Sequence, residues 1–189
     1  MEYFLVGFFP KHRWTQENFP DSFPAPKFVQ QICSASNCIV KGPSCFDYPA
    51  ISEVSFNQYG GFNRLEDAKS VIPSGHREEY DIFAYWIPEM IYEDGQTKPA
   101  EIGCVEPDEI PPENDDFEVI GFDVIEMAYC SIGHSPLTCN GQAGLYESML
   151  NKYCLVQKEA DAIKLAEKFS IEKPEPGNYT VVEVRLLRA

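Results

Sequence analysis

Apolar residues alternate with polar ones along several short stretches of the chain, which is the pattern of β-strands. Between Phe117 and Met127, Ile120, Phe122 and Val124 share one face of such a strand. Residues 80–87 and 179–187 are predicted as further strands. The run Tyr3–Phe9 is apolar on both faces, which predicts a central strand that ends at Pro10.

A helical period appears near the C-terminus. Ala162, Leu165, Ala166 and Phe169 stand at positions i, i+3, i+4 and i+7, so we expect the main amphipathic helix at about 158–169. A short strand at 153–156, this helix and the strand at 179–187 would form a βαβ-like unit. Shorter helices are expected near 27–33, 64–71 and 142–150, together covering one face of a sheet.

These patterns predict an α+β fold with a mostly antiparallel or mixed sheet. Five prolines between Trp14 and Pro49 argue against long regular elements there, so we expect this Pro-rich segment to wrap the surface. A chain of 189 residues with 13 Phe, 10 Tyr and 2 Trp can bury a large core. We therefore expect a single α+β domain over residues 1–189.

Charge narrows the range of partners. The chain has 30 acidic and 15 basic residues, a net charge of −15, and Glu101–Glu118 is an acidic loop without any basic residue. Such a field repels nucleic acid and anionic membranes. No apolar run approaches the roughly 18 residues that cross a bilayer, and no signal peptide is recognised. We expect a soluble, cytoplasmic protein.

The same charge favours a non-catalytic module that binds a basic protein partner. An immunity-type or antitoxin-like inhibitor is an example of this class by analogy of charge and size alone. Solubility by itself would also account for the charge. No cofactor is predicted, enzymatic activity and oligomeric state stay open, and the predicted partner-binding residues are Glu106, Asp108, Glu109, Glu113, Asp115 and Asp116.

An alternative is a small thiol-dependent enzyme that uses Cys139 and His134. Cys139 stands in a turn before a possible helix, whose dipole would favour a thiolate, and His134 precedes it by five residues. A thiolate beside an imidazole is the minimum for nucleophilic catalysis. Simple turn chemistry at Asn140–Gly141, with Cys139 as a small apolar residue, explains the same sequence.

A second alternative is a zinc-stabilised structural domain. Cys130, His134 and Cys139, with Cys154, have the number of ligands that tetrahedral zinc needs, but not the common spacing. A second thiol cluster, Cys33-x4-Cys38-x6-Cys45, lacks a clear fourth ligand. The seven cysteines are odd in number and dispersed, which favours reduced thiols, so no metal site is predicted.

Two further groups are judged from the sequence. His12 is expected on the surface, in a basic patch with Lys11 and Arg13. Asp123 lies within a predicted strand and gains interest only if its face is buried, because burial raises the pKa of a carboxyl group. Nucleotide-binding, zincin and serine-hydrolase motifs are absent from the sequence.

Overall fold

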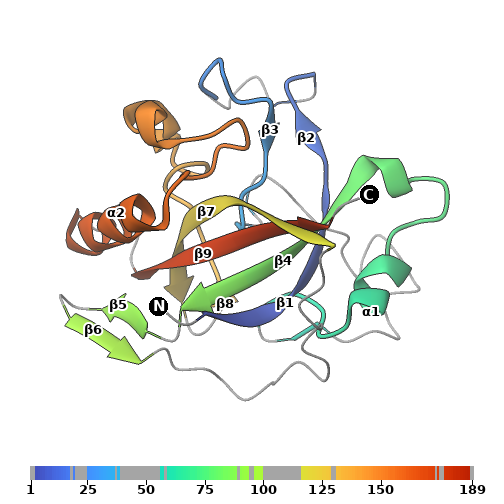
Figure 1. Ribbon diagram of the computed structural model, residues 1–189, viewed down its shortest axis with the longest axis horizontal. Coiled ribbons are helices and arrows are strands. Elements are labelled where there is room, and N and C mark those ends of the chain that lie inside the picture. The colour runs from blue at the N-terminus through green and yellow to red at the C-terminus, as the bar shows by residue number, and fades with distance from the viewer. Residues whose placement is uncertain are drawn as a thin grey trace.

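An antiparallel sheet organises the molecule (Figure 1). The computed structural model describes residues 3–17, 19, 25–36, 38, 56–57, 59–88, 90–93, 96–99, 116–128, 131–172, 174 and 177–187. Seven strands of these residues form one sheet: β1 (Tyr3–His12), β4 (Tyr80–Pro88), β5 (Met90–Glu93), β6 (Gln96–Pro99), β7 (Phe117–Ala128), β8 (Ser131–Ile132) and β9 (Asn178–Leu187). A separate pair joins β2 (Trp14–Thr15) to β3 (Gln31–Ile32).

Strand β9 lies at the centre of the sheet. It pairs with β4 and β5 along one edge and with β7 along the other, and β4 pairs in turn with β1. All of these pairings are antiparallel. The predicted α+β class with an antiparallel sheet is therefore confirmed.

The first strand departs from the prediction in position and length. Strand β1 stands at the end of the strand order, next to β4, and its outer side meets Phe62 through an isolated bridge at Phe8. Pro10 does not end the strand, which continues to His12. An edge strand tolerates proline because one side of it needs no ladder hydrogen bond. Residues 5–11 are nonetheless buried, so the apolar run reflects covered faces rather than a central place.

Glycine permits a bulge in each of two strands. The register shifts between Leu5 and Gly7 in β1 and between Val119 and Gly121 in β7, where the φ angles of the glycines are +141° and +145°. A residue with a Cβ rarely adopts such angles. At Gly121 a Cβ would also lie 2.8 Å from the Cβ of Leu155.

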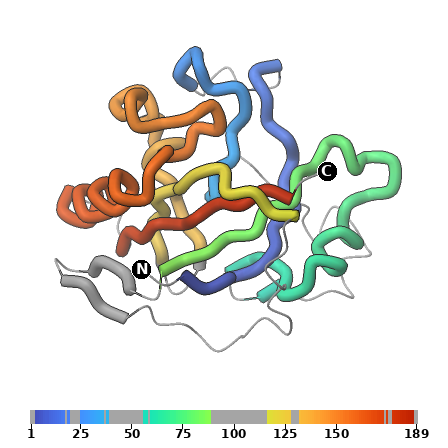
Figure 2. The backbone as a smooth tube through the Cα atoms, viewed as in Figure 1, coloured from blue at the N-terminus to red at the C-terminus, as the bar shows by residue number. Residues whose placement is uncertain are grey.

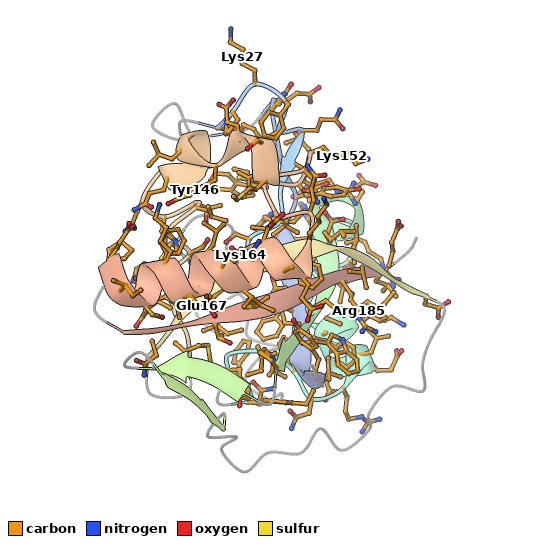
Figure 3. The ribbon with its side chains drawn as sticks, turned by 60° about the vertical axis from the view of Figure 1, so that its left-hand side comes forward. Lys27, Tyr146, Lys152, Lys164, Glu167 and Arg185 are labelled. Carbon is orange, nitrogen blue, oxygen red and sulfur yellow. The ribbon has the colours of Figure 1, made fainter. Side chains whose placement is uncertain are left out.

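Helix α2 (Glu159–Glu172) packs across β9 and β7 (Figure 3). Its buried residues include the four positions of the predicted stripe, and they share a cluster with Val124 and Val181. The next residues along the two strands, Ile125 and Val182, belong to a second cluster. Because successive strand residues point to opposite faces, α2 covers one face of the sheet, and the second cluster lies on the other.

The segment around Cys33 covers part of that second face. Cys33 and Ala35 belong to the same cluster as Ile125 and Val182. The backbone of residues 30–33 bonds to the carbonyls of Lys152 and Tyr153, so the segment runs beside residues 150–156 (Figure 2). The helix predicted at 27–33 is wrong, because these backbone groups bond to a distant segment instead of to each other.

Of the two remaining short helices predicted from the sequence, one is present as an α-helix and the other is not. Helix α1 (Leu65–Ser70) lies within the predicted 64–71, whereas residues 142–150 form two 3₁₀ turns, η3 (Gln142–Leu145) and η4 (Glu147–Met149), and η2 (Arg77–Glu79) precedes β4. The strand predicted at 153–156 is reduced to isolated bridges at Val156. The βαβ-like unit is therefore wrong.

Several predictions fall on residues beyond the structural description. Half of the Pro-rich segment lies outside the described residues, as do Cys45, Cys104, Cys130 and the acidic residues Glu106, Asp108, Glu109, Glu113 and Asp115. Asp116 is described, and it is exposed immediately before β7. Among the described helices, none combines the length and the apolar character that a bilayer crossing requires.

Candidate functional site

Two thiol sulfurs and one imidazole nitrogen from two distant segments meet at the surface. One ligand atom each from Cys38, His134 and Cys139 lies within 4.8 Å of the other two. The Cys38 Sγ is 2.9 Å from the His134 Nδ1. Cys38 and His134 are exposed and Cys139 is half-buried, so the group faces solvent.

His134 is held by strand β7 through the backbone. The Glu126 N–H donates to the His134 carbonyl at 2.8 Å, and the Gly133 N–H donates to the Glu126 carbonyl at 2.9 Å. There is no room for a side chain at Gly133, because a Cβ there would lie 2.8 Å from the Glu126 carbonyl oxygen. After β8 the chain therefore stays close to β7, which fixes the position of the His134 imidazole.

A single turn then carries the chain from His134 to Cys139. The Cys139 N–H donates to the Ser135 carbonyl at 2.7 Å, and the Thr138 N–H donates to the same oxygen at 3.2 Å. Leu137 is fully buried and fixes the turn to the core. The five-residue spacing of His134 and Cys139 thus brings both side chains to one side of a compact turn.

Asp123 ties this turn to the segment that carries Cys38. Its carboxylate is fully buried and accepts a hydrogen bond from the Ser135 Oγ at 2.7 Å. It also accepts from the Ser34 Oγ at 2.8 Å and from the Ala35 N–H at 2.9 Å, while the Val124 N–H donates to it at 2.8 Å. One carboxylate on β7 therefore fixes both segments that bear the ligand atoms.

Lys11 fixes the same segment from the other side. Its Nζ donates to three consecutive carbonyls, those of Ser34, Ala35 and Ser36, at 3.0, 2.7 and 3.0 Å. The side chain is 1% exposed. An ammonium group has three N–H donors, so these three oxygens satisfy it. The sequence-based placement of Lys11 in a surface patch is wrong, because β1 continues through Pro10 and turns Lys11 inward.

Burial and charge shift the pKa values of these groups in defined directions. Burial raises the pKa of Asp123, and its four hydrogen bonds oppose the shift. Burial lowers the pKa of Lys11, and the negative charge of Asp123 opposes that shift. Burial also raises the pKa of Cys139 to about 11, so this thiol keeps its proton at neutral pH.

Ser36 links the buried groups to the thiols. Its Oγ lies 3.0 Å from the Cys139 Sγ and accepts the Cys38 N–H at 3.2 Å. The Thr138 Oγ1 donates to the Ser34 Oγ at 3.0 Å, which joins the turn directly to the segment. The two sulfur atoms are therefore placed by a continuous set of hydrogen bonds that begins at Lys11 and Asp123.

The cysteines are grouped differently in space than along the sequence. His134 and Cys139 do come together, but the third member, Cys38, comes from the other thiol cluster, 96 residues before His134. Cys33 and Cys154 are buried in the core and are not part of the group. Spacing along the chain gave no signal for Cys38, because its neighbourhood is created by the contact between two loops.

A separate hollow lies elsewhere on the surface. It has a volume of about 590 Å³ and is lined by His12, Arg13, Trp14, Thr15, Glu78 and Glu79. Its guanidinium group is already engaged, because Arg13 forms an ion pair with Asp81 at 2.7 Å. None of Cys38, His134 and Cys139 lines this hollow, so these three residues remain the candidate site.

Comparisons of the chain with protein-family models, with curated proteins and with solved structures find no match. Two thiols and an imidazole can bind a soft or borderline metal ion, or they can react as nucleophiles.

Proposed function

We propose that this protein binds zinc through Cys38, His134 and Cys139. The observation that carries the proposal is the convergence of these three ligand atoms, within 4.8 Å of one another, from two loops far apart in the sequence. Thiolate and imidazole are the ligands that zinc prefers, and two thiolates neutralise its charge. Three protein ligands leave the fourth position of the tetrahedron to water or to another ligand.

The distances support a tetrahedral ion after a small adjustment. With usual bond lengths, a sulfur and a nitrogen on one tetrahedral zinc are about 3.6 Å apart, and two sulfurs are about 3.8 Å apart. The Cys38 Sγ and the His134 Nδ1 are 2.9 Å apart, so this pair has to open by about 0.7 Å. Loss of the shared proton on metal binding removes the hydrogen bond that holds them closer.

The surroundings support the same assignment. Ligands of metal sites are oriented by hydrogen bonds from a second layer of residues. Here Ser36 lies against the Cys139 Sγ, and Asp123 and Lys11 hold the segment that leads to Cys38. The zinc site, which the sequence favoured least, is thus preferred to the Cys139–His134 nucleophile, because the imidazole of His134 contacts the Cys38 Sγ at 2.9 Å.

Zinc content and a cobalt spectrum test the proposal. The full chain, purified under reducing conditions, should contain one zinc per molecule. Replacement of zinc by cobalt should give the visible bands of a tetrahedral ion and the near-ultraviolet bands of cobalt–thiolate bonds. Cys38→Ser, Cys139→Ser and His134→Asn should each lose these bands and most of the zinc affinity.

His76→Asn is the matched control for His134→Asn. His76 is also exposed, but its Nδ1 lies 2.8 Å from a Glu79 oxygen and it is not one of the three ligands. This variant should bind zinc like the wild type. Folded wild-type protein without zinc, or cobalt spectra unchanged in the three ligand variants, would refute the metal site.

The acidic partner-binding module is kept as a separate proposal, supported by the net charge of −15. A basic protein partner should be captured from a native lysate at low salt and lost at high salt, since screening weakens the attraction.

We also propose a reducing, cytoplasmic location, because zinc needs free thiols. Free Cys33, Cys38, Cys139 and Cys154 support this proposal.

A further inference from the structure

Cys38 and Cys139 differ in exposure although their sulfur atoms are close. Both Sγ atoms belong to the group whose members lie within 4.8 Å of one another. Cys38 is exposed, while Cys139 is half-buried and has the Ser36 Oγ 3.0 Å from its sulfur. The other described cysteines, Cys33 and Cys154, are buried and lie outside the group. The pair is therefore the accessible dithiol of the described part of the chain.

His134 gives the two thiols different chemical roles. Its Nδ1 is 2.9 Å from the Cys38 Sγ, close enough to take the thiol proton as the sulfur attacks an electrophile. The position of Cys139 in the turn is fixed by the hydrogen bond from its backbone N–H to the Ser135 carbonyl, at 2.7 Å. Cys38 is thus placed to react first with a reagent from solvent, and Cys139 is placed to react second, with Cys38.

We propose that Cys38 and Cys139 form a site of oxidative modification, in which a hydroperoxide converts the metal-free dithiol to a disulfide. In the first step the Cys38 sulfur bonds to the terminal peroxide oxygen and the O–O bond breaks. The thiol proton passes through His134 to the departing alkoxide, so the products are Cys38 sulfenic acid and an alcohol, or water from hydrogen peroxide.

In the second step the Cys139 sulfur bonds to the Cys38 sulfur. The S–O bond of the sulfenic acid breaks, and its hydroxyl leaves as water with the proton of the Cys139 thiol. The two thiols supply two electrons and the peroxide accepts them. The sulfur atoms have to close from at most 4.8 Å to the disulfide bond length of about 2.0 Å, for which the exposed Cys38 side chain has room.

The modification would also control the metal site, and this part rests on the proposed zinc function. A disulfide removes two of the three ligands, so the oxidised protein cannot hold the ion. Conversely, zinc bound to both sulfurs and to the imidazole leaves no free thiol to be oxidised and no free nitrogen to accept its proton. Zinc binding and oxidation therefore exclude each other.

Peptide mapping of the full chain tests the inference. Metal-free, reduced protein is treated with one equivalent of hydrogen peroxide, blocked with a thiol reagent and digested without reductant. Mass spectrometry should find the peptide of Cys38 linked to that of Cys139. In Cys139→Ser, Cys38 should instead be trapped by dimedone as the sulfenic acid, and in Cys38→Ser neither product should form.

Two rate comparisons separate a built site from general thiol oxidation. His134→Asn should oxidise at least tenfold more slowly, since a positioned proton acceptor contributes about 10²-fold or more, while His76→Asn should keep the wild-type rate. Zinc-loaded protein should also form the linked peptide at least tenfold more slowly than metal-free protein. Circular dichroism of each variant confirms that it is folded.

The outcomes distinguish this inference from the proposed function. If zinc binds but the linked peptide is absent, or Cys38 is linked mainly to another cysteine, the oxidation site is refuted and the zinc site stands. If zinc does not bind but the linked peptide forms with the expected variant pattern, the zinc site is refuted and the oxidation site stands. An unchanged rate in His134→Asn also overturns the role of the imidazole.

Discussion

Two groups of polar side chains lie next to each other in this molecule and differ in almost every physical respect. Lys11 and Asp123 are sealed in the sheet face, at 1% and 0% exposure, and each is satisfied by several hydrogen bonds. Cys38 and His134 lie at the surface and share one short contact. In this site the buried charged groups support the structure, while the exposed thiol and imidazole are the groups proposed to bind the metal ion.

The largest effect is expected when the buried ammonium group is removed. Lys11→Met should lower the free energy of unfolding by about 3–5 kcal/mol, because Asp123 loses a compensating charge and three carbonyls lose their donor. Urea denaturation followed by circular dichroism measures the change. Lys164→Met, on the exposed side of α2 (Figure 3), should change it by less than about 0.5 kcal/mol. Equal effects of the two variants would show that the buried charge does not support the fold.

The surface group should add stability only when zinc is bound. Free zinc at 100 times its Kd should raise the free energy of unfolding of the wild type by about 2.7 kcal/mol. Cys38→Ser should abolish this increase, yet its metal-free stability should stay within about 0.5 kcal/mol of the wild type, because the side chain is exposed. Thermal melts with zinc and with chelator measure both quantities. A large loss of stability in the metal-free variant would contradict the division between support and chemistry.

A double-mutant cycle sharpens the role of the buried pair. Lys11 and Asp123 grip the same segment, Ser34–Ser36, from opposite sides. The losses of stability caused by Lys11→Met and Asp123→Asn should therefore not add. The double variant should lose less than the sum of the two single losses, by about 0.5–3 kcal/mol. Denaturation of the four proteins gives the coupling energy. Additivity within about 0.3 kcal/mol would mean that the two charges act separately.

The smallest effect is expected at the link between the two groups. Ser36→Ala removes the hydroxyl beside the Cys139 Sγ and should cost about 1 kcal/mol of stability. Zinc affinity should fall by about tenfold or more, because an orienting hydrogen bond is lost. Competition with a chromophoric chelator measures the affinity. Ser148→Ala, an exposed serine in η4, is the control, and an equal loss there would assign the effect to general destabilisation.

The periodicity of the sequence was informative wherever a strand or helix buries one regular face. The alternation in 117–127 and the strand at 80–87 correspond to β7 and β4, and the antiparallel α+β class is confirmed. It failed where long-range contacts decide. Strand β1 is buried over residues 5–11 although it stands at the end of the strand order, and the backbone of residues 30–33 bonds to residues 152–153 instead of forming a helix.

The candidate site was predictable only in the part that is local in sequence. His134 and Cys139 are five residues apart in one turn, so a sequence pattern could single them out. Cys38 joins them through a loop contact that leaves no periodic trace. Asp123 is buried, which is the condition under which it was of interest from the sequence, whereas Lys11 is buried although the basic patch with His12 and Arg13 predicted a surface position.

Asp123 is hydrogen-bonded to both segments that carry the ligand atoms, so these ligands cannot be moved to another protein without it. A peptide copied from residues 130–141 would carry His134 and Cys139 but neither Cys38 nor the carboxylate that orders Ser135. Grafting that linear stretch onto another scaffold would transfer ligands without their spacing. The smallest unit that could be grafted is a piece of the sheet in which β1 and β7 side chains face one covering loop. The site can therefore be transferred only together with this part of the fold.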